Sequence, residues 1–177
     1  MKRKNIKETI REYFFINPTA KMRVRQIERE TKLPLPSVIR YCNELDKEGI
    51  LRGEKVSGIY VYSADRASKQ FLLEKKLYNI KSLYACRLIE YLIEELSNPL
   101  IIVFGSYAKG EDIERSDIDI YIQTSSKKNV AGEKFEKLLK RKLQMFVQSD
   151  MRQINNPHLM NNIINGVILN GFLEVFK

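Results

Sequence analysis

The chain has 177 residues, enough for one large domain or two small ones, and we expect two. No apolar run approaches the roughly 18 residues of a membrane-spanning helix, and the basic start leads into polar residues, so we expect a cytoplasmic protein without a membrane partner. The net charge is +9, and residues 1–64 hold 14 Lys and Arg against 8 Asp and Glu, an excess that suits nucleic acid.

Residues 1–64 are predicted to form a first domain of three helices followed by a β-hairpin. Apolar residues recur at helical spacing in three segments, residues 6–16, 23–32 and 36–48. Two apolar runs then flank a polar turn, so strands are expected at residues 50–52 and 59–62. Pro36 suits the first turn of the third helix and Gly49 suits its end, which gives this helix clear boundaries.

This order of elements resembles the winged helix-turn-helix of many prokaryotic transcription regulators, and residues 36–51, PSVIRYCNELDKEGIL, carry most of the likeness. In that family the third helix enters the major groove of DNA and the hairpin contacts the backbone. The resemblance implies duplex DNA as a partner and a DNA-binding set of Ser37, Arg40, Asn43, Lys47 and Lys55. Arg40 is the best candidate for a base contact, because a guanidinium can form two hydrogen bonds with guanine. A protein-interaction module is the alternative.

Residues 65–97 are predicted to form a helical linker of two packing helices. Apolar residues recur every three or four positions, at Leu73, Leu77, Ile80 and Tyr84 and then at Leu88, Leu92 and Leu96. The simplest division places the break near residues 81–82. Winged helices usually read paired half-sites as dimers, so we expect the first of these helices to contribute to a homodimer, with packing inside one chain as the alternative.

The apolar run at residues 100–104 is predicted to be a buried strand that delivers Gly105 and Ser106 into a sharp turn. We expect Ser106 to cap the helix that follows, and free amides at that helix start suit a phosphate. Asp117 and Asp119 lie at the next predicted strand, where alternate side chains share one face. Two adjacent carboxylates repel each other, so this pair predicts a divalent cation such as Mg²⁺ between them.

The spacing of Gly105-Ser106, ten residues and then Asp117-x-Asp119 resembles the signature of the minimal nucleotidyltransferases of the DNA polymerase beta superfamily. The resemblance covers residues 98–177 and implies an α/β (α+β) domain with a mixed sheet and flanking helices. It implies that Gly105 and Ser106 bind the nucleotide and that Asp117 and Asp119 are catalytic and bind Mg²⁺ or Mn²⁺. The implied reaction transfers a nucleoside monophosphate from a nucleoside triphosphate, with ATP expected, to a hydroxyl.

The residues after Ile122 are predicted to complete this domain. Further helices and strands are expected at residues 132–141, 143–147 and 157–165, and a tight hairpin is expected at Asn170-Gly171. The helix at residues 132–141 would place Phe135, Leu138 and Leu139 inward and Lys134, Lys137, Lys140 and Arg141 outward. Such a basic face either binds RNA or is solvated.

In the resembled family, the strand after the Asp-x-Asp pair usually supplies a third carboxylate, and that position falls on Gln144. An amide coordinates a metal weakly and cannot act as a base, so the sequence leaves catalytic activity open. Asp150 is a candidate substitute at the end of the same strand.

The sequence therefore leaves two candidate functions. One is a nucleotidyltransferase whose hydroxyl acceptor could be a protein, as in antitoxin members of the family. The other is a DNA-binding transcription regulator whose nucleotidyltransferase domain is weak or inactive and binds only nucleotide or a partner protein encoded nearby.

Overall fold

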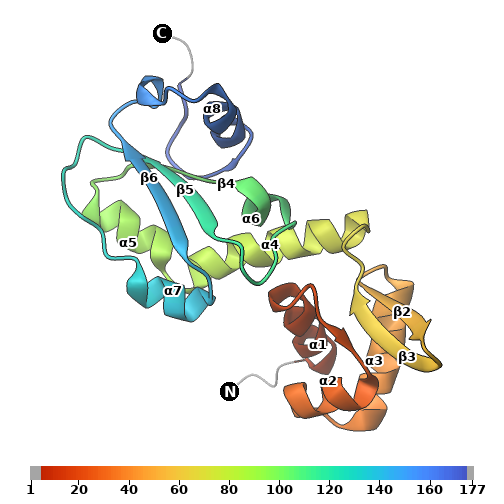
Figure 1. Ribbon diagram of the computed structural model, residues 1–177. Helices are drawn as coiled ribbons and strands as arrows, with labels where there is room; N and C mark the ends of the chain where they lie inside the picture. Colours follow the sequence, from red (N-terminus) through yellow and green to blue (C-terminus); the bar gives the residue numbers. More distant parts are fainter. Residues whose placement is uncertain (1–4, 175–177) are drawn as a thin grey trace. The chain divides into compact units, whose positions relative to one another are not determined.

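The computed structural model describes residues 5–174 and divides the chain into two compact units, Met1–Tyr78 and Asn79–Lys177 (Figure 1). The boundary between the units falls inside the region predicted as a helical linker, and the domain limits expected at residues 64 and 97 stay predictions. Both helices and sheets are present, which agrees with the expected mixed α+β class. Across residues 5–174, no helix is both long enough and apolar enough to cross a membrane.

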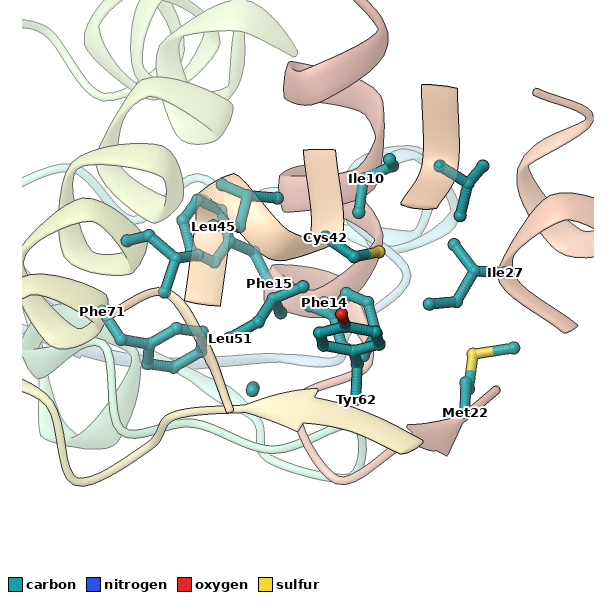
Figure 2. Close-up of a cluster of buried hydrophobic side chains, with 13 residues drawn as sticks. Ile10, Phe14, Phe15, Met22, Ile27, Cys42, Leu45, Leu51, Tyr62 and Phe71 are labelled. Atoms are coloured by element: carbon teal, nitrogen blue, oxygen red, sulfur yellow. The ribbon is translucent and has the colours of Figure 1, made fainter. Parts of the chain in front are cut away.

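The first unit packs helices α1 Ile6–Ile16, α2 Val24–Thr31 and α3 Leu35–Lys47 around one apolar core. Asn5 begins α1, because its side chain accepts a hydrogen bond from Lys7 N at 3.1 Å. Phe14, Cys42 and Leu45 are fully buried between the helices and the sheet (Figure 2). The three predicted helices are therefore present, and the third one buries Val38, Cys42 and Leu45.

The sheet of the first unit has the strand order β1-β3-β2, with antiparallel pairing throughout. Its strands are β1 Lys21–Met22, β2 Leu51–Val56 and β3 Ile59–Ala64. Ser57 and Gly58 join β2 to β3 with φ of +48° and +81°, as in the two-residue turns whose twist matches a β-hairpin. The predicted hairpin is therefore present. The short strand β1 was not predicted, because two residues carry no periodicity.

Helix α4, Lys69–Ala85, crosses the boundary between the units, and α5 follows as Leu88–Glu95. The break predicted near residues 81–82 is wrong, since the helix continues to Ala85 and ends before Arg87, which has a φ of +64°. Three of the four apolar positions that predicted this helix are also exposed, since Leu73, Leu77 and Tyr84 are 52%, 57% and 41% exposed. The buried positions are instead Phe71, Lys75, Asn79 and Leu83.

The second unit is built on a mixed sheet with the strand order β6-β5-β4-β7. Its strands are β4 Leu100–Phe104, β5 Ile118–Gln123, β6 Leu143–Gln148 and β7 Val167–Asn170. β5 and β6 run parallel, whereas β4 is antiparallel to both β5 and β7. The helix between β5 and β6 is α7, Glu133–Leu139, which provides the crossover that a parallel pair requires.

Helices cover both faces of this sheet (Figure 1). On one face, α5, α7 and the short helix α6 Gly105–Lys109 pack on the isoleucines of β5. On the other face, α8 Pro157–Ile164 and the 3₁₀ turn Met151–Gln153 pack on Phe104 and Tyr121. Leu138 of α7 is 66% exposed, so its predicted inward orientation is wrong. Asp119, which alternates with the isoleucines, therefore lies on the α8 face.

The tight hairpin predicted at Asn170-Gly171 is not found in the described residues, and residues 175–177 of its expected second strand lie outside them. β7 pairs with β4 instead. Asn170 Nδ2 donates a hydrogen bond to Asn98 Oδ1 at 2.9 Å and another to Pro99 O at 2.6 Å. Asn170 thus fastens the end of β7 by hydrogen bonds to the two residues that precede β4.

Candidate functional site

Gly105 lies where β4 ends and α6 begins, directly against the Asp119 carboxylate. Its φ of +71° suits glycine and is strained for other residues. A Cβ atom built on Gly105 would overlap Asp119 Oδ2 and lie 3.4 Å from Asp119 Cγ. The antiparallel register, which pairs Phe104 with Asp119, brings the two residues together. The turn and one of the two predicted carboxylates therefore meet at one end of the sheet.

Asp117 precedes β5 and is exposed, whereas Asp119 lies within β5 and is half-buried. Burial, together with the charge of Asp117, raises the pKa of Asp119 above its ordinary value. The Asp117 carboxylate therefore lies close enough to disfavour the ionisation of Asp119. A divalent cation relieves this repulsion, because it adds a larger positive charge than any nearby side chain.

Ser106 occupies the first turn of α6, so the prediction that it caps this helix is wrong. Phe104 holds the N-cap position and makes no side-chain hydrogen bond there. The carbonyl oxygen of Ser106 accepts a hydrogen bond from Glu111 N at 2.9 Å, which closes the far end of α6. Ser106 therefore adjoins Gly105 in the turn, and its role in nucleotide binding stays a prediction.

Gln144 stands directly beside Asp119, because the parallel register of β5 and β6 pairs these two residues. Gln144 is exposed, and paired residues of neighbouring strands point to the same face. Asp150 lies beyond the opposite end of β6, where its carboxylate accepts a hydrogen bond from Arg152 N at 2.8 Å. Six residues of extended chain span about 20 Å, so Asp150 is not a substitute for Gln144.

The residues present fit one divalent cation shared with substrate phosphates. Within residues 5–174, no group of three or more His, Cys, Asp or Glu side chains could hold a metal. Mg²⁺ is commonly bound by one or two carboxylates together with phosphate oxygens, and Asp117 and Asp119 offer that donor set. A site with three carboxylates and two ions does not fit this chain, because Gln144 supplies no charge.

A buried polar network, which the sequence analysis did not find, supports the loop that carries Asp117. Asp112 is 2% exposed, and its Oδ2 lies 3.8 Å from Arg141 Nη2 in an ion pair. Asn79 Nδ2 donates to Asp112 Oδ1 at 2.7 Å and to Tyr107 O at 2.9 Å. The network links α4, α6 and the segment before β6. No sequence motif marks these positions, since they meet only in the folded chain.

Three of the five predicted DNA contacts in the first unit are exposed on one face of α3. Arg40, Asn43 and Lys47 lie on this face, and Val38 and Cys42 lie buried behind it. The set is completed by Ser37, which is half-buried, and Lys55, which is exposed near the hairpin turn.

Local partners hold two of these α3 side chains. Arg40 Nε donates to Glu44 Oε1 at 2.9 Å, and Tyr62 OH donates to Asn43 Oδ1 at 2.5 Å. The hydrogen bond with Glu44 also raises the pKa of Arg40. A ligand of Arg40 would therefore compete with Glu44.

Residues 86–171 match the family model described as polymerase beta, nucleotidyltransferase. The matched segment includes the Gly105 turn, both carboxylates and Gln144. This match supports the assignment of the segment to the nucleotidyltransferase superfamily, and it supports nucleotidyl transfer at that level. Members of the superfamily generally use a nucleoside triphosphate and a divalent metal. No curated protein and no solved structure matches the chain.

Proposed function

We propose that the second unit transfers a nucleoside monophosphate from a nucleoside triphosphate, with ATP expected, to a hydroxyl. Asp117 and Asp119 would bind the Mg²⁺ or Mn²⁺ ion that accompanies the nucleotide. The observation that carries this proposal is the close approach of the Gly105 turn to the Asp119 carboxylate. Because Gly105 has no side chain, a phosphate can approach the backbone beside the carboxylate pair. The family match of residues 86–171 supports the same reaction class.

The residues of this chain would bind and orient the substrates. Gly105 and Ser106 offer backbone amides to the phosphates, and Asp117 and Asp119 offer carboxylate oxygens to the ion. The ion, when bound, neutralises phosphate charge and polarises the phosphoryl group. The acceptor oxygen forms a bond to the α-phosphorus, the bond from that phosphorus to pyrophosphate breaks, and the hydroxyl proton passes to solvent.

Gln144 limits the expected rate of this reaction. A positioned general base typically contributes about 10²–10⁴-fold to the rate, and an amide at this position contributes none of it. We therefore expect metal-dependent nucleotide binding together with slow turnover. If turnover is absent while binding is intact, the unit acts as a nucleotide sensor, which is the alternative to an enzyme.

Titration calorimetry of the full chain with ATP tests the proposal, in the presence and the absence of Mg²⁺. Wild type should bind ATP only with Mg²⁺, and the double variant Asp117→Asn, Asp119→Asn should lose this binding. Asp150→Asn is the matched control, because it removes a carboxylate from the far end of β6. Unchanged affinity in the double variant would show that the nucleotide site is elsewhere.

We propose as a second function that the first unit binds duplex DNA as a winged helix. The exposed set of Arg40, Asn43 and Lys47 on α3 favours this function. Contacts between cations and phosphates release counterions, so the affinity for duplex DNA should fall steeply as salt rises. No binding of duplex DNA at low salt would instead assign the unit to protein interaction, for which exposed Ile39 and Tyr60 are suited.

A further inference from the structure

Strand β7 forms one edge of the sheet in the second unit, with β4 on its inner side. The outer side of an edge strand presents backbone N–H and C=O groups to any neighbouring chain, and proteins commonly protect it with charged side chains or proline. The four residues of β7, VILN, include neither. In contrast, the edge strand β2 of the first unit carries Arg52, Glu54 and Lys55. The β7 edge is therefore able to pair with a further strand.

The chain around β7 lacks Asp, Glu, Lys and Arg over an unusual length. Residues 153–173 contain none of these four residue types, although they make up 30% of the whole chain. The positive excess of the chain lies mainly in residues 1–64, where 14 Lys and Arg stand against 8 Asp and Glu. Charged residues are depleted at the cores of protein–protein interfaces, because burial of an unpaired charge is costly. The segment that contains β7 therefore suits burial against a protein rather than against nucleic acid.

Large apolar side chains on and beside β7 are exposed. Ile168 of β7 pairs with Ile102, which packs with Ile163 of α8, so Ile168 points to the α8 face of the sheet. Ile168 is nevertheless 46% exposed, and Ile164 at the end of α8 is exposed as well. Phe172, two residues after β7, is 79% exposed. Several exposed apolar side chains in so short a segment favour a protein-binding surface.

An aromatic side chain from α4 adjoins the same strand. The register between β7 and β4 skips Leu169, and Leu169 O accepts a hydrogen bond from Tyr84 OH at 2.8 Å. Tyr84 is therefore held at β7, and it is exposed. Aromatic residues are enriched in the interfaces between proteins. We call Tyr84, Ile164, Ile168 and Phe172, together with the outer edge of β7, the β7 edge surface.

A second copy of the chain is complementary to the β7 edge surface, because two identical antiparallel strands are related by a twofold axis. If the axis passes through Ile168, this residue pairs with Ile168 of the second copy, and Val167 pairs with Leu169 in both directions. Each of these pairs is apolar, and no like charges meet across the strands. We propose that the chain forms a dimer through β7, in which the two four-stranded sheets join into one.

The interface of this dimer is expected to be small. The four residues of β7 supply only a few backbone hydrogen bonds, so the exposed apolar side chains of the β7 edge surface must supply most of the buried area. Interfaces that bury less than about 1,200 Å² in total are weak or transient. We therefore expect a dimer dissociation constant in the micromolar range. This dimer requires neither ATP nor DNA, so its failure is distinct from failure of the proposed functions.

Sedimentation velocity of the full chain over a concentration series tests the proposal. Wild type should pass from monomer to dimer as its concentration rises. Ile168→Lys should weaken the dimer about tenfold or more, because it removes two apolar contacts and places two like charges opposite each other. Val147→Lys is the matched control, since Val147 is 42% exposed on β6, the opposite edge of the same sheet. This control should dimerise like wild type.

A mixing experiment tests the twofold register and excludes misfolding as the cause of a lost dimer. Ile168→Glu alone should be monomeric, for the same reason as Ile168→Lys alone. An equal mixture of the two variants should form a heterodimer, because the opposite charges then lie directly across from each other. A mixture that stays monomeric at concentrations where wild type is dimeric would overturn the inference.

Other occupants of the β7 edge surface and other dimer interfaces give different results. Leu77→Lys changes an exposed leucine of α4 and should leave the dimer intact. Loss of the dimer in Leu77→Lys, with Ile168→Lys still dimeric, would overturn the inference in favour of an interface on α4. Loss in Val147→Lys alone would overturn it in favour of the β6 edge. Monomeric wild type at every concentration would also overturn it and would leave β7 open to a strand of another protein.

Discussion

Replacement of Gly105 by alanine tests the central geometry of the site. Gly105 has a φ of +71°, and a residue with a Cβ atom in this conformation costs about 1–2 kcal/mol of stability. The new Cβ would also overlap Asp119 Oδ2, while Asp119 Cγ and Cβ lie 3.4 and 3.7 Å away. Only the end of the Asp119 side chain must move, so the cost in stability stays close to the backbone cost. The displaced carboxylate would then be turned away from the proposed ion site.

Gly58→Ala is the matched control for Gly105→Ala, because Gly58 has a φ of +81° and a Cβ atom there would meet nothing within 4 Å. Both variants should lower the stability of their own unit by a similar amount, measured by calorimetric unfolding. Only Gly105→Ala should weaken Mg²⁺-dependent ATP binding, by about 10–100-fold, as is typical when a metal ligand loses its support. Equal ATP affinity in the two variants would show that the close contact between Gly105 and the Asp119 carboxylate has no role in nucleotide binding.

Three further predictions concern single positions. Gln144→Asp should raise metal-dependent pyrophosphate release by about 10²–10⁴-fold, and robust wild-type release that this change leaves unaltered would show that two carboxylates suffice. Arg40→Ala should weaken binding of a specific duplex about tenfold or more and Glu44→Ala should strengthen it, whereas no change in either would remove α3 from the DNA interface. Burial raises the pKa of the Cys42 thiol to about 12, so the unfolded state loses this proton first and unfolding midpoints should fall as pH rises from about 9. Cys42→Ala should flatten that fall, and an identical pH profile would contradict this cause.

Local signals in the sequence predicted the helices and the hairpin of the first unit, though not the two-residue strand β1, because these elements carry their own boundaries. Pro36 and Gly49 delimit α3, and Ser57-Gly58 supplies the positive φ angles of the hairpin turn. The face of α4 could not be predicted in the same way. Its buried positions include Lys75 and Asn79, so apolar periodicity selected exposed leucines instead.

In the second unit, the motif located the turn and the carboxylates, and the strand register then set Gln144 beside Asp119. The Asp112–Arg141 pair could not be predicted, because nothing local to either residue indicates the other. The hairpin prediction at Asn170-Gly171 failed for a related reason. The dipeptide is a strong local turn signal, but in the folded chain Asn170 pairs with Ile101 of β4 and is hydrogen-bonded to Asn98.

The pairing of β7 with β4 also has a consequence for the order of folding. Ile102 pairs with Tyr121 on one side and with Ile168 on the other, and the second pairing closes a loop more than three times as long. This difference adds about 1 kcal/mol of loop-closure entropy, so the β4–β5 pair should form before β7 docks. Until then, β4 is an unprotected apolar edge that can recruit a strand from another molecule. Aggregation during refolding should therefore depend on how quickly residues 167–170 pair with β4.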